Sequence, residues 1–385
     1  MAGFFSQSGS ARLETQCSNI KSYLVKIPKT SKNFLLAAIA SFIMAAIFGF
    51  EMAAPDSAFS AVLGGLILLS LALHQIEKLR DSVFTLWVFV AFALGLLFPE
   101  SILQLGSFET KSLIIPLLMV IMFGMGCTIS LSDFARVIAM PKAVSVGLIC
   151  QFTLMPLMGF LLAYLSNLPS EIAAGIILVG CSPSGLASNV MAFVAKANVA
   201  LSLTLTAIAT LIAPFITPLL MRLLADELVE IDALAMFFSM LKIVILPVVA
   251  GLIVNRLMRH KVAIINRTMP LVSMVGIVVI IAIIVAAGQT AIMNIGMVLI
   301  LIVLLHNLLG FALGYGAAKL LKLEEQDARS IAFEVGMQNS GLASGIALAM
   351  NKLASMGLAP AFFSPVQNIT GSTLATYWRN KSQTR

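Results

Sequence analysis

The chain has 385 residues, of which 60% are hydrophobic and 11% charged, and its mean hydropathy is +1.03. These values are far from those of a soluble globular domain and are typical of a helical protein that crosses a membrane several times. A formal net charge of +7 could suggest nucleic-acid binding, but the basic residues are scattered singly at the ends of apolar runs, where membrane topology explains them. The composition therefore excludes a soluble domain and a nucleic-acid-binding protein.

Twelve apolar segments follow one another along the chain. A polar, basic stretch over residues 1–33 precedes them, which we interpret as a cytoplasmic tail, with a transit peptide as the alternative. Segments 34–50 and 59–74, separated by an acidic turn, are expected to form a helical hairpin within residues 34–80. The other ten segments are expected at residues 84–98, 112–130, 143–165, 171–196, 199–224, 234–258, 263–287, 295–320, 328–351 and 359–378.

The distribution of charge predicts the orientation of these segments. With the N-terminus inside and alternating crossings, 20 basic residues fall inside and three, Lys111, Arg222 and Lys352, fall outside. Because basic residues collect on the cytoplasmic side of a membrane protein, we expect both termini to be cytoplasmic. The expected membrane is the bacterial inner membrane, with an organelle envelope as the alternative.

One motif occurs twice. The chain reads V-G-C-S-P-S-G-L-A-S from Val179 and V-G-M-Q-N-S-G-L-A-S from Val335, so seven of ten residues recur. Each copy lies in an apolar segment whose middle carries Ser, Gly, Pro or Asn, residues that loosen a helix or bond its backbone groups. The motif predicts two broken membrane helices, and paired interruptions of this kind indicate the binding site of a secondary transporter.

The two copies lie in the fourth and ninth of the ten main segments. Each is fourth in a unit of five, and because five is odd, the second unit enters the membrane with the opposite orientation. We therefore predict an all-α polytopic membrane protein with an inverted repeat of five plus five helices, over residues 84–225 and 232–379, and a short tail at 380–385. The broken helices are expected to cross near the midplane, and the N-terminal hairpin lies outside the symmetry.

Glu334 precedes the second break inside an apolar segment. An ionised carboxylate at membrane depth costs about 2.5–3.5 kcal/mol unless a partner compensates it. Side chains with oxygen atoms that could share a small cation with this carboxylate are Gln151, Ser188, Asn189, Ser202, Thr206, Gln338 and Asn339. Since oxygen ligands suit a hard cation, sodium is the predicted ion.

Four polar residues within the apolar segments allow other interpretations. Lys242 is a second conceivable partner of Glu334, although its side chain could extend outward to the membrane surface. Ser202 and Thr206 lie on one helix face, and taken alone they could simply bond their own helix. His306 is interpreted as a helix-packing residue, with a proton relay as the alternative.

The segments C-S-P-S-G-L-A-S-N-V-M-A-F-V-A-K from Cys181 and F-E-V-G-M-Q-N-S-G-L-A from Phe333 resemble the two signature regions of the bile acid:sodium symporter family. The resemblance runs from Phe84 to Trp378 and implies ten helices in two inverted repeats with two sodium sites. One site would use the side chains of Ser188, Asn189, Ser202, Thr206 and Glu334. The other would use the side chains of Gln151, Glu334 and Gln338 with the carbonyls of Val335 and Met337.

The substrate is expected between the two breaks. The expected neighbours are Ser184, Gly185, Leu186, Ala187 and Ser188 of the first break and Asn339 and Ser340 of the second. Many members of the family carry C-P-G-G-T-A-S-N, so Leu186 stands where they have a threonine near the substrate and removes a hydroxyl donor. Two sodium charges against one carboxylate leave about one positive unit, which a small or amphipathic organic carboxylate would balance.

The predicted function is therefore sodium-coupled symport of an organic anion by alternating access, and not catalysis. A proton-coupled carrier, or a passive uniporter or channel, is the alternative transport mechanism. An intramembrane serine protease built on Ser184 and His306 is disfavoured, because the G-x-S-G pattern fails at Ser182 and the second S-G-L-A-S copy would have no role.

Overall fold

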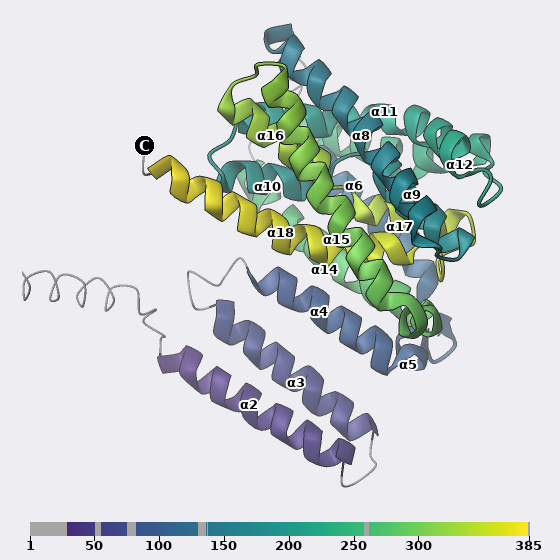
Figure 1. Cartoon of the computed structure of the whole chain (residues 1–385). Helices are drawn as coiled ribbons and strands as arrows, with labels where there is room; N and C mark the ends of the chain where they lie inside the picture. Colours follow the sequence, from purple (N-terminus) through teal and green to yellow (C-terminus); the bar gives the residue numbers. More distant parts are fainter. Residues whose placement is uncertain are drawn as a thin grey trace, which may run out of the picture. The chain divides into compact units, whose positions relative to one another are not determined.

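The computed structural model describes residues 29–50, 55–74, 82–129, 136, 138–257 and 262–383 (Figure 1). The expected N-terminal tail falls outside these ranges as far as residue 28. The described part is almost entirely helical, with one short antiparallel pair of strands.

The helices and strands follow in this order: α2 (Lys29–Phe50), α3 (Pro55–His74), α4 (Ser82–Leu97), α5 (Pro99–Leu103), β1 (Gln104–Leu105), β2 (Phe108–Glu109), η2 (Thr110–Leu113), α6 (Ile114–Thr128), α8 (Pro141–Ser166), α9 (Ser170–Cys181), α10 (Leu186–Val194), α11 (Val199–Ala225), α12 (Ala233–Met240), η3 (Leu241–Ile245), α13 (Leu246–Leu257), α14 (Val262–Ala287), α15 (Gln289–Leu320), α16 (Glu325–Gly336), α17 (Ser340–Ala349) and α18 (Leu358–Gln383).

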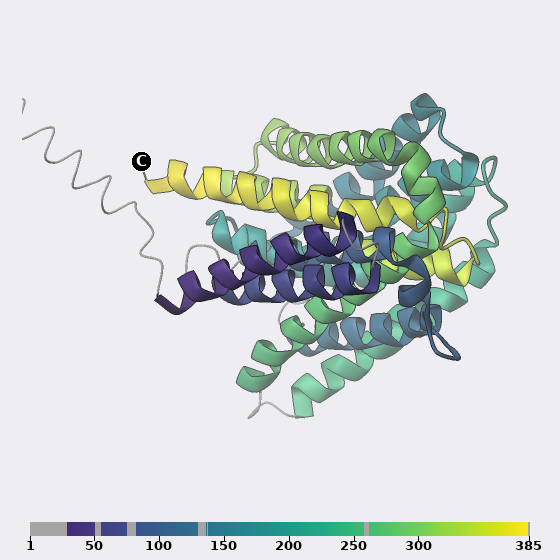
Figure 2. The ribbon, with the colours of Figure 1, turned by 90° about the horizontal axis from the view of Figure 1, so that it is seen from below.

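The chain divides into two compact units, the first ending at Val90 and the second beginning at Ala91. In the first unit, α2 and α3 lie side by side as a helical hairpin (Figure 2). The Ser31 hydroxyl, which is buried, donates to the Ala72 carbonyl at 2.8 Å and joins the two helices. Helix α2 begins at Lys29, earlier than the predicted start at Phe34. The prediction began late because the first turn of the helix is polar and carries no apolar signal.

In the second unit, five of the described helical stretches are long and apolar enough to cross a membrane. They are Thr110–Thr128, Pro141–Ser166, Val199–Ala225, Ala233–Leu257 and Gln289–Leu320. Shorter apolar helices accompany them, among them one half of each helix predicted to be broken, α9 (Ser170–Cys181) and α17 (Ser340–Ala349). This composition is that of an all-α membrane protein.

Close backbone approach shapes the contact between α6 and α13. A Cβ atom on Gly126 would lie 2.1 Å from the Val248 carbonyl oxygen, and one on Gly251 would lie 2.2 Å from the Phe123 carbonyl oxygen. Helices in a membrane gain little from the hydrophobic effect against each other, so small residues that permit such contacts stabilise the pair. Replacing either glycine would push the two backbones apart.

The structure differs from the predicted segments in several places. The segment predicted at 234–258 contains a π-helical turn, η3, in which the Leu246 amide bonds to the Leu241 carbonyl. The turn ends two residues before Pro247, which has no amide hydrogen to continue the regular ladder. Helix α5 and the strand pair before α6 were not predicted, since each is too short to produce a periodic pattern. Helix α18 continues to Gln383, through most of the expected C-terminal tail.

Candidate functional site

Both copies of the repeated motif interrupt a helix. The first helix ends with α9 at Cys181 and resumes with α10 at Leu186; the second ends with α16 at Gly336 and resumes with α17 at Ser340. Pro183 lacks an amide hydrogen and therefore cannot continue the first helix. The residue after each first half, Ser182 or Met337, has an extended backbone.

The two interruptions pair with each other. Ser184 and Gln338 form an antiparallel bridge, flanked by hydrogen bonds from the Gly185 amide to the Met337 carbonyl at 3.1 Å and from the Asn339 amide to the Pro183 carbonyl at 2.8 Å. Backbone groups released by a broken helix are costly in a membrane unless they find partners. Each break therefore satisfies the other, and the two motifs are held at one place although they are far apart in sequence.

Glu334 lies at this crossing and is 2% exposed. Four hydroxyl groups donate to its carboxylate, from Ser184 at 2.6 Å, Ser188 at 2.6 Å, Ser202 at 2.5 Å and Thr206 at 2.8 Å. They come from the first break, α10 and α11, whereas the carboxylate comes from α16. The structure thus gathers the predicted hydroxyls around Glu334, and adds Ser184, which was predicted only as a substrate neighbour.

Two of the hydroxyls around Glu334 have more acceptors within reach than protons to donate. The Asn189 Oδ1 atom lies 2.9 Å from the Ser202 hydroxyl and 3.4 Å from the Thr206 hydroxyl, yet both hydroxyls also reach Glu334. A hydroxyl carries a single proton and cannot donate fully to two acceptors. Such a cluster is the donor set that a hard cation prefers, because the ion binds several oxygen atoms at once.

A second group of polar side chains also lies at the crossing. Gln151 of α8 donates through Nε2 to the Ser182 carbonyl at 2.8 Å and to Gln338 Oε1 at 2.7 Å, and Gln338 donates through Nε2 to the Val335 carbonyl at 2.6 Å. Because carbonyls only accept, these contacts fix which end of each amide is nitrogen. The Gln151 Oε1 atom is then left buried and without a hydrogen-bond partner.

This unpaired oxygen fits the predicted second cation site. Buried polar atoms nearly always have partners, so an orphaned carbonyl oxygen beside further oxygens is a candidate ligand for an ion. The backbone carbonyls that were predicted as additional ligands are engaged within the protein, Val335 by Gln338 and Met337 by the Gly185 amide. A carbonyl oxygen has two lone pairs, so both retain capacity for a cation.

The predicted substrate neighbours fall into two groups, one buried and one half-buried. Ser184, Gly185, Ser188, Asn339 and Ser340 are buried at the crossing. Leu186 and Ala187, in the first turn of α10, are half-buried and are therefore the more accessible part of this set.

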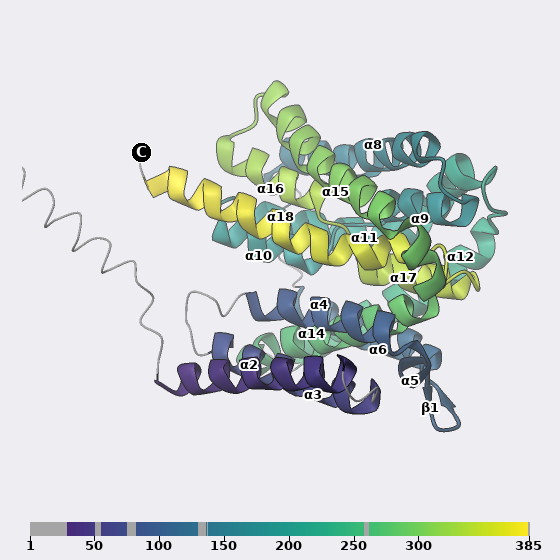
Figure 3. The same cartoon turned by 60° about the horizontal axis from the view of Figure 1, so that its bottom comes forward.

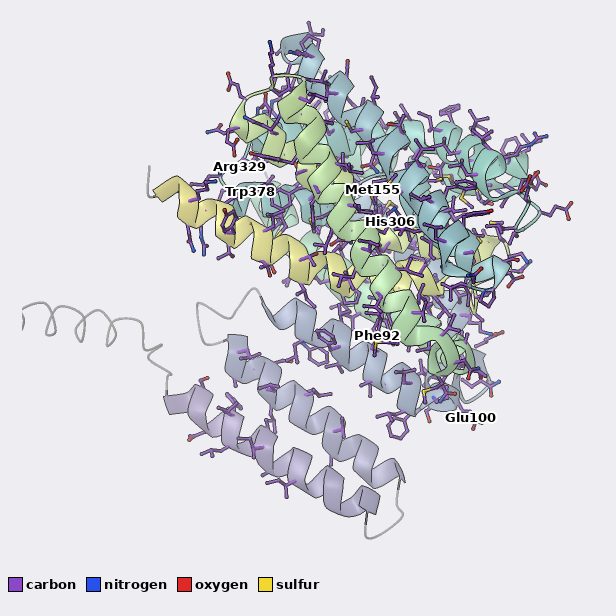
Figure 4. All side chains as sticks on the ribbon, in the orientation of Figure 1. Phe92, Glu100, Met155, His306, Arg329 and Trp378 are labelled. Carbon is purple, nitrogen blue, oxygen red and sulfur yellow. The ribbon has the colours of Figure 1, made fainter. Side chains whose placement is uncertain are left out.

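Two residues considered as alternatives lie elsewhere. Lys242 is exposed in the π-helical turn η3, and the hydrogen bonds described for Glu334 come from hydroxyls. His306 is fully buried and bonds through Nε2 to the Met155 carbonyl at 3.0 Å (Figure 4). Its ring also packs edge-on against that of Phe363. These contacts are those of a helix-packing residue. Thr210, four residues after Thr206 on α11, contacts the Met125 sulfur and not Glu334.

Sequence reasoning missed two side chains that hold the second break. Gln367 of α18 bonds to the backbone of Gln338, and Asn307 of α15 donates to the Gly336 carbonyl at 2.8 Å. Each is an amide within an apolar segment, a signal that could have drawn attention to it. Neither lies near the repeated motif in sequence, so nothing local connected it to the break.

Two hollows flank the end of α17 that points away from the crossing. One, of about 610 Å³, is lined by residues of η2 and of the stretch from Leu348 to Ala354, including Lys111; the other, of about 200 Å³, includes Lys352. Between the larger hollow and the crossing, Leu118 of α6 is fully buried against α17. A Cβ atom on Gly345 would lie 2.2 Å from Leu118 Cδ1, so this glycine creates the space that Leu118 fills.

The first turn of α16 is anchored by a polar cluster around Glu325. Its carboxylate accepts from Arg329 Nε at 3.0 Å and from the Tyr315 hydroxyl at 3.0 Å, and Lys319 Nζ lies at 3.4 Å. Arg329 also lies over the Trp378 ring, 5.6 Å from its centroid (Figure 4). The helices that carry these two residues, α16 and α18, both pack against α15 (Figure 3). Burial alone would raise the pKa of Glu325, but hydrogen bonds from Arg329, Tyr315 and Lys319 outweigh it and hold this pKa below its usual value.

Glu325→Gln is expected to destabilise the protein at pH 7 by less than about 1 kcal/mol, because ion pairs that remain partly exposed contribute little. The folded-state pKa of Glu325 is lowered, so its stabilising contribution is present above the unfolded pKa and is lost as the pH falls through the folded one. Thermal unfolding in detergent should therefore show a difference from wild type at pH 7 that shrinks below the ordinary pKa of 4.5. If the stability difference between Glu325→Gln and wild type were the same at pH 7 and below pH 4.5, this account would be wrong.

Comparisons with known proteins give one consistent result. The family model described as the Sodium Bile acid symporter family matches residues 115–295. The chain is 43% identical over 310 residues to "Uncharacterized sodium-dependent transporter YocS" of Bacillus subtilis (strain 168), covering 80% of this chain and 94% of the relative. It is also 35% identical over 304 residues to "Probable sodium/metabolite cotransporter BASS1, chloroplastic" of Arabidopsis thaliana, covering 78% of this chain and 74% of that protein.

Proposed function

The chain belongs to the sodium bile acid symporter family, and from this premise we propose that it is a symporter that couples sodium entry to the transport of an organic anion. Family and relatives together establish a sodium-dependent membrane transporter and not an enzyme. The choice of substrate, the number of ions and the mechanism are parts of the proposal.

The observation that carries the proposal is the environment of Glu334. A buried carboxylate with four hydroxyls and the Asn189 oxygen around it is a site for a cation of small radius and no strong geometric demand. Sodium binds there as a transported ion, and its charge compensates the carboxylate. The ligands come from the first break, α10, α11 and α16, so binding joins elements that can otherwise move apart.

A second sodium ion is proposed at Gln151 and Gln338, where the unpaired Gln151 Oε1 atom offers a free ligand. Two ions against the single carboxylate of Glu334 leave about one positive unit in a site of low dielectric constant. An organic carboxylate balances this charge. Helices α10 and α17 both begin at the crossing, and their positive N-terminal ends favour an anion placed between them.

We propose that the accessible part of the substrate site is the first turn of α10, at Leu186 and Ala187. The apolar Leu186 side chain favours contact with a hydrocarbon part of the substrate over a hydrogen bond to it. The substrate class is therefore a small or amphipathic organic carboxylate whose charge faces the buried polar residues of the crossing.

Alternating access is the proposed mechanism. The hollow that contains Lys111 lies at one end of α17, and we propose that Leu118, which is buried against Gly345, is the side chain that separates it from the crossing. Movement of α6 relative to α17 would open this path, because the contact between them is apolar. Sodium binding stabilises the arrangement of the broken helices that accepts substrate, and release on the other side follows when the ions leave.

The proposal includes the fold-level expectations. Two five-helix repeats of opposite orientation, over 84–225 and 232–379, would place α9 with α10 and α16 with α17 at equivalent positions. Both termini are proposed to be cytoplasmic, in the bacterial inner membrane or an organelle envelope.

Uptake by purified protein in liposomes tests the function. With a library of labelled organic carboxylates, preselected by thermal shift in sodium buffer, uptake should require an inward sodium gradient and should fall to background in choline. Uptake driven by a proton gradient in choline would instead identify a proton-coupled carrier. Uptake that equilibrates without any ion gradient would identify a passive uniporter.

Removal of residues 1–80 is expected to leave sodium binding unchanged. All ligands proposed for sodium lie between Gln151 and Gln338, and the deleted stretch lies outside the repeated helices. Sodium-dependent thermal stabilisation of the truncated and full-length proteins should have the same midpoint concentration of sodium. A truncated protein that elutes as a folded species but is no longer stabilised by sodium would show that the functional core has been misplaced.

A further inference from the structure

Gln367 of α18 contacts the second break in a way that imitates a neighbouring strand. Its Oε1 atom accepts from the Gln338 amide at 2.7 Å, and its Nε2 atom donates to the Gln338 carbonyl at 3.0 Å. The same Nε2 atom lies 3.3 Å from the Ser340 hydroxyl, at the first residue of α17. Gln367 is 5% exposed, so water does not compete for these contacts.

The break creates the need for this partner. The Met337 amide still bonds to the Phe333 carbonyl, but the helix has ended and the next amide, that of Gln338, bonds outside it. The first break pairs with the second on one side through Ser184, and the Gln367 side chain occupies the other. Gln338 is thus held between two partners, as a residue is held in the middle of a sheet.

This arrangement determines where the Gln338 side chain points. With its amide and carbonyl both fixed, the backbone of Gln338 cannot rotate, and its side chain is directed to Gln151 Nε2 and the Val335 carbonyl. A neighbouring contact supports the same segment, since Thr370 donates to Asn307 Oδ1 at 2.5 Å and Asn307 holds the Gly336 carbonyl. Helix α18 therefore positions the end of α16 through two successive turns.

We propose that Gln367 is a positioning residue for the second cation site: it holds Gln338 so that the oxygens of Gln151 and Gln338 face one ion. The inference rests on the proposed function, because it assigns a role within the sodium site. Gln367 does not itself bind the ion. Its loss should weaken one of the two ions selectively, since the contacts around Glu334 involve residues that Gln367 does not touch.

The test is a sodium titration of Gln367→Met and Gln367→Asn. Methionine keeps the length and volume of the side chain without its hydrogen bonds, and asparagine keeps the amide but is too short to make both contacts. In each variant the Hill coefficient for sodium-dependent thermal stabilisation should fall from near two toward one. The affinity of the second site, at Gln151 and Gln338, should fall by about 10- to 100-fold, the usual effect of removing a residue that orients a ligand.

Asn368→Leu is the matched control. Asn368 is the neighbouring amide of α18, is also buried, and donates to the Ser364 carbonyl of its own helix. This variant should keep the wild-type Hill coefficient even if its melting temperature falls, which separates positioning from general stability. If Gln367→Met does not fold, the Hill coefficient of Gln367→Asn tests the proposal.

The outcomes separate this inference from the proposed function. A wild type without any response to sodium would defeat the proposed function itself, and a wild-type Hill coefficient of one would defeat the proposal of two ions. A wild-type coefficient near two that is unchanged in both Gln367 variants would overturn the role of Gln367 alone. A coefficient that falls equally in Asn368→Leu would also overturn it.

Discussion

Glu334→Gln is expected to abolish sodium-driven uptake while leaving membrane insertion intact. The carboxylate is the common acceptor of four hydroxyls and the proposed source of negative charge for the ion. Removing one partner of a buried charge pair costs about 3–5 kcal/mol, which corresponds to a loss of more than about 100-fold in sodium affinity. Insertion should become easier, because an ionised carboxylate at membrane depth costs about 2.5–3.5 kcal/mol.

The measurement compares Glu334→Gln with Glu325→Gln. Both variants remove one carboxylate from α16, but Glu325 lies in the first turn, bound to Arg329, and Glu334 lies at the crossing. Uptake in liposomes should fall to background only in the first, with both proteins recovered from the membrane in similar amounts. Normal uptake by Glu334→Gln with an unchanged sodium dependence would refute both sodium sites, since Glu334 is a proposed ligand in each.

The candidate site could largely be identified from the sequence because its signals are local. A carboxylate within an apolar segment marks a functional site by default, as a cation ligand or a proton carrier, which singled out Glu334. Ser202 and Thr206 are four residues apart, so they share a helix face wherever the helix lies. The repeated S-G-L-A-S motif predicted both interruptions, and the structure has them between Cys181 and Leu186 and between Gly336 and Ser340.

The parts that could not be predicted depend on contacts between distant segments. Ser184 was expected near the substrate, yet its hydroxyl points to Glu334, 150 residues away in sequence. Gln367 and Asn307 lie in segments whose patterns predict only a membrane helix. Their function appears when α18 and α15 pack against the second break, because only then do the released backbone groups of that break have defined neighbours.

The pairing of the two breaks also explains why the motif occurs twice. A single interrupted helix would leave amides and carbonyls in the membrane without partners. Two interruptions that cross satisfy each other, as the hydrogen bonds from Gly185 to Met337 and from Asn339 to Pro183 show. The same pairing ties the two breaks together, so we expect an ion bound at one break to change the stability of the other.

Asn189→Ala is expected to uncouple sodium from substrate. Asn189 follows the first break, and its Oδ1 atom is one of the oxygens shared with Ser202 and Thr206, so its loss removes a ligand and leaves the charge of Glu334 in place. Linkage requires that sodium and substrate strengthen each other's binding by equal factors, typically about 5- to 150-fold. Wild type should show such an enhancement of substrate affinity in saturating sodium relative to choline, and Asn189→Ala should lose most of it.

Asn255→Ala is the control for this measurement of sodium–substrate coupling. Asn255 is an amide of α13 that donates to the carbonyls of Cys127 and Ile129 and not to the crossing, so its removal should keep the enhancement. Isothermal titration of substrate in sodium and in choline gives the coupling factor for all three proteins.

The wild-type result decides the mechanism. A ligand shifts a conformational equilibrium only through different affinities for its states. Equal substrate affinity in sodium and choline for wild type would therefore mean that the ions around Glu334 do not select the substrate-binding arrangement. Symport would then be excluded, and a passive carrier would be the better explanation of the crossing.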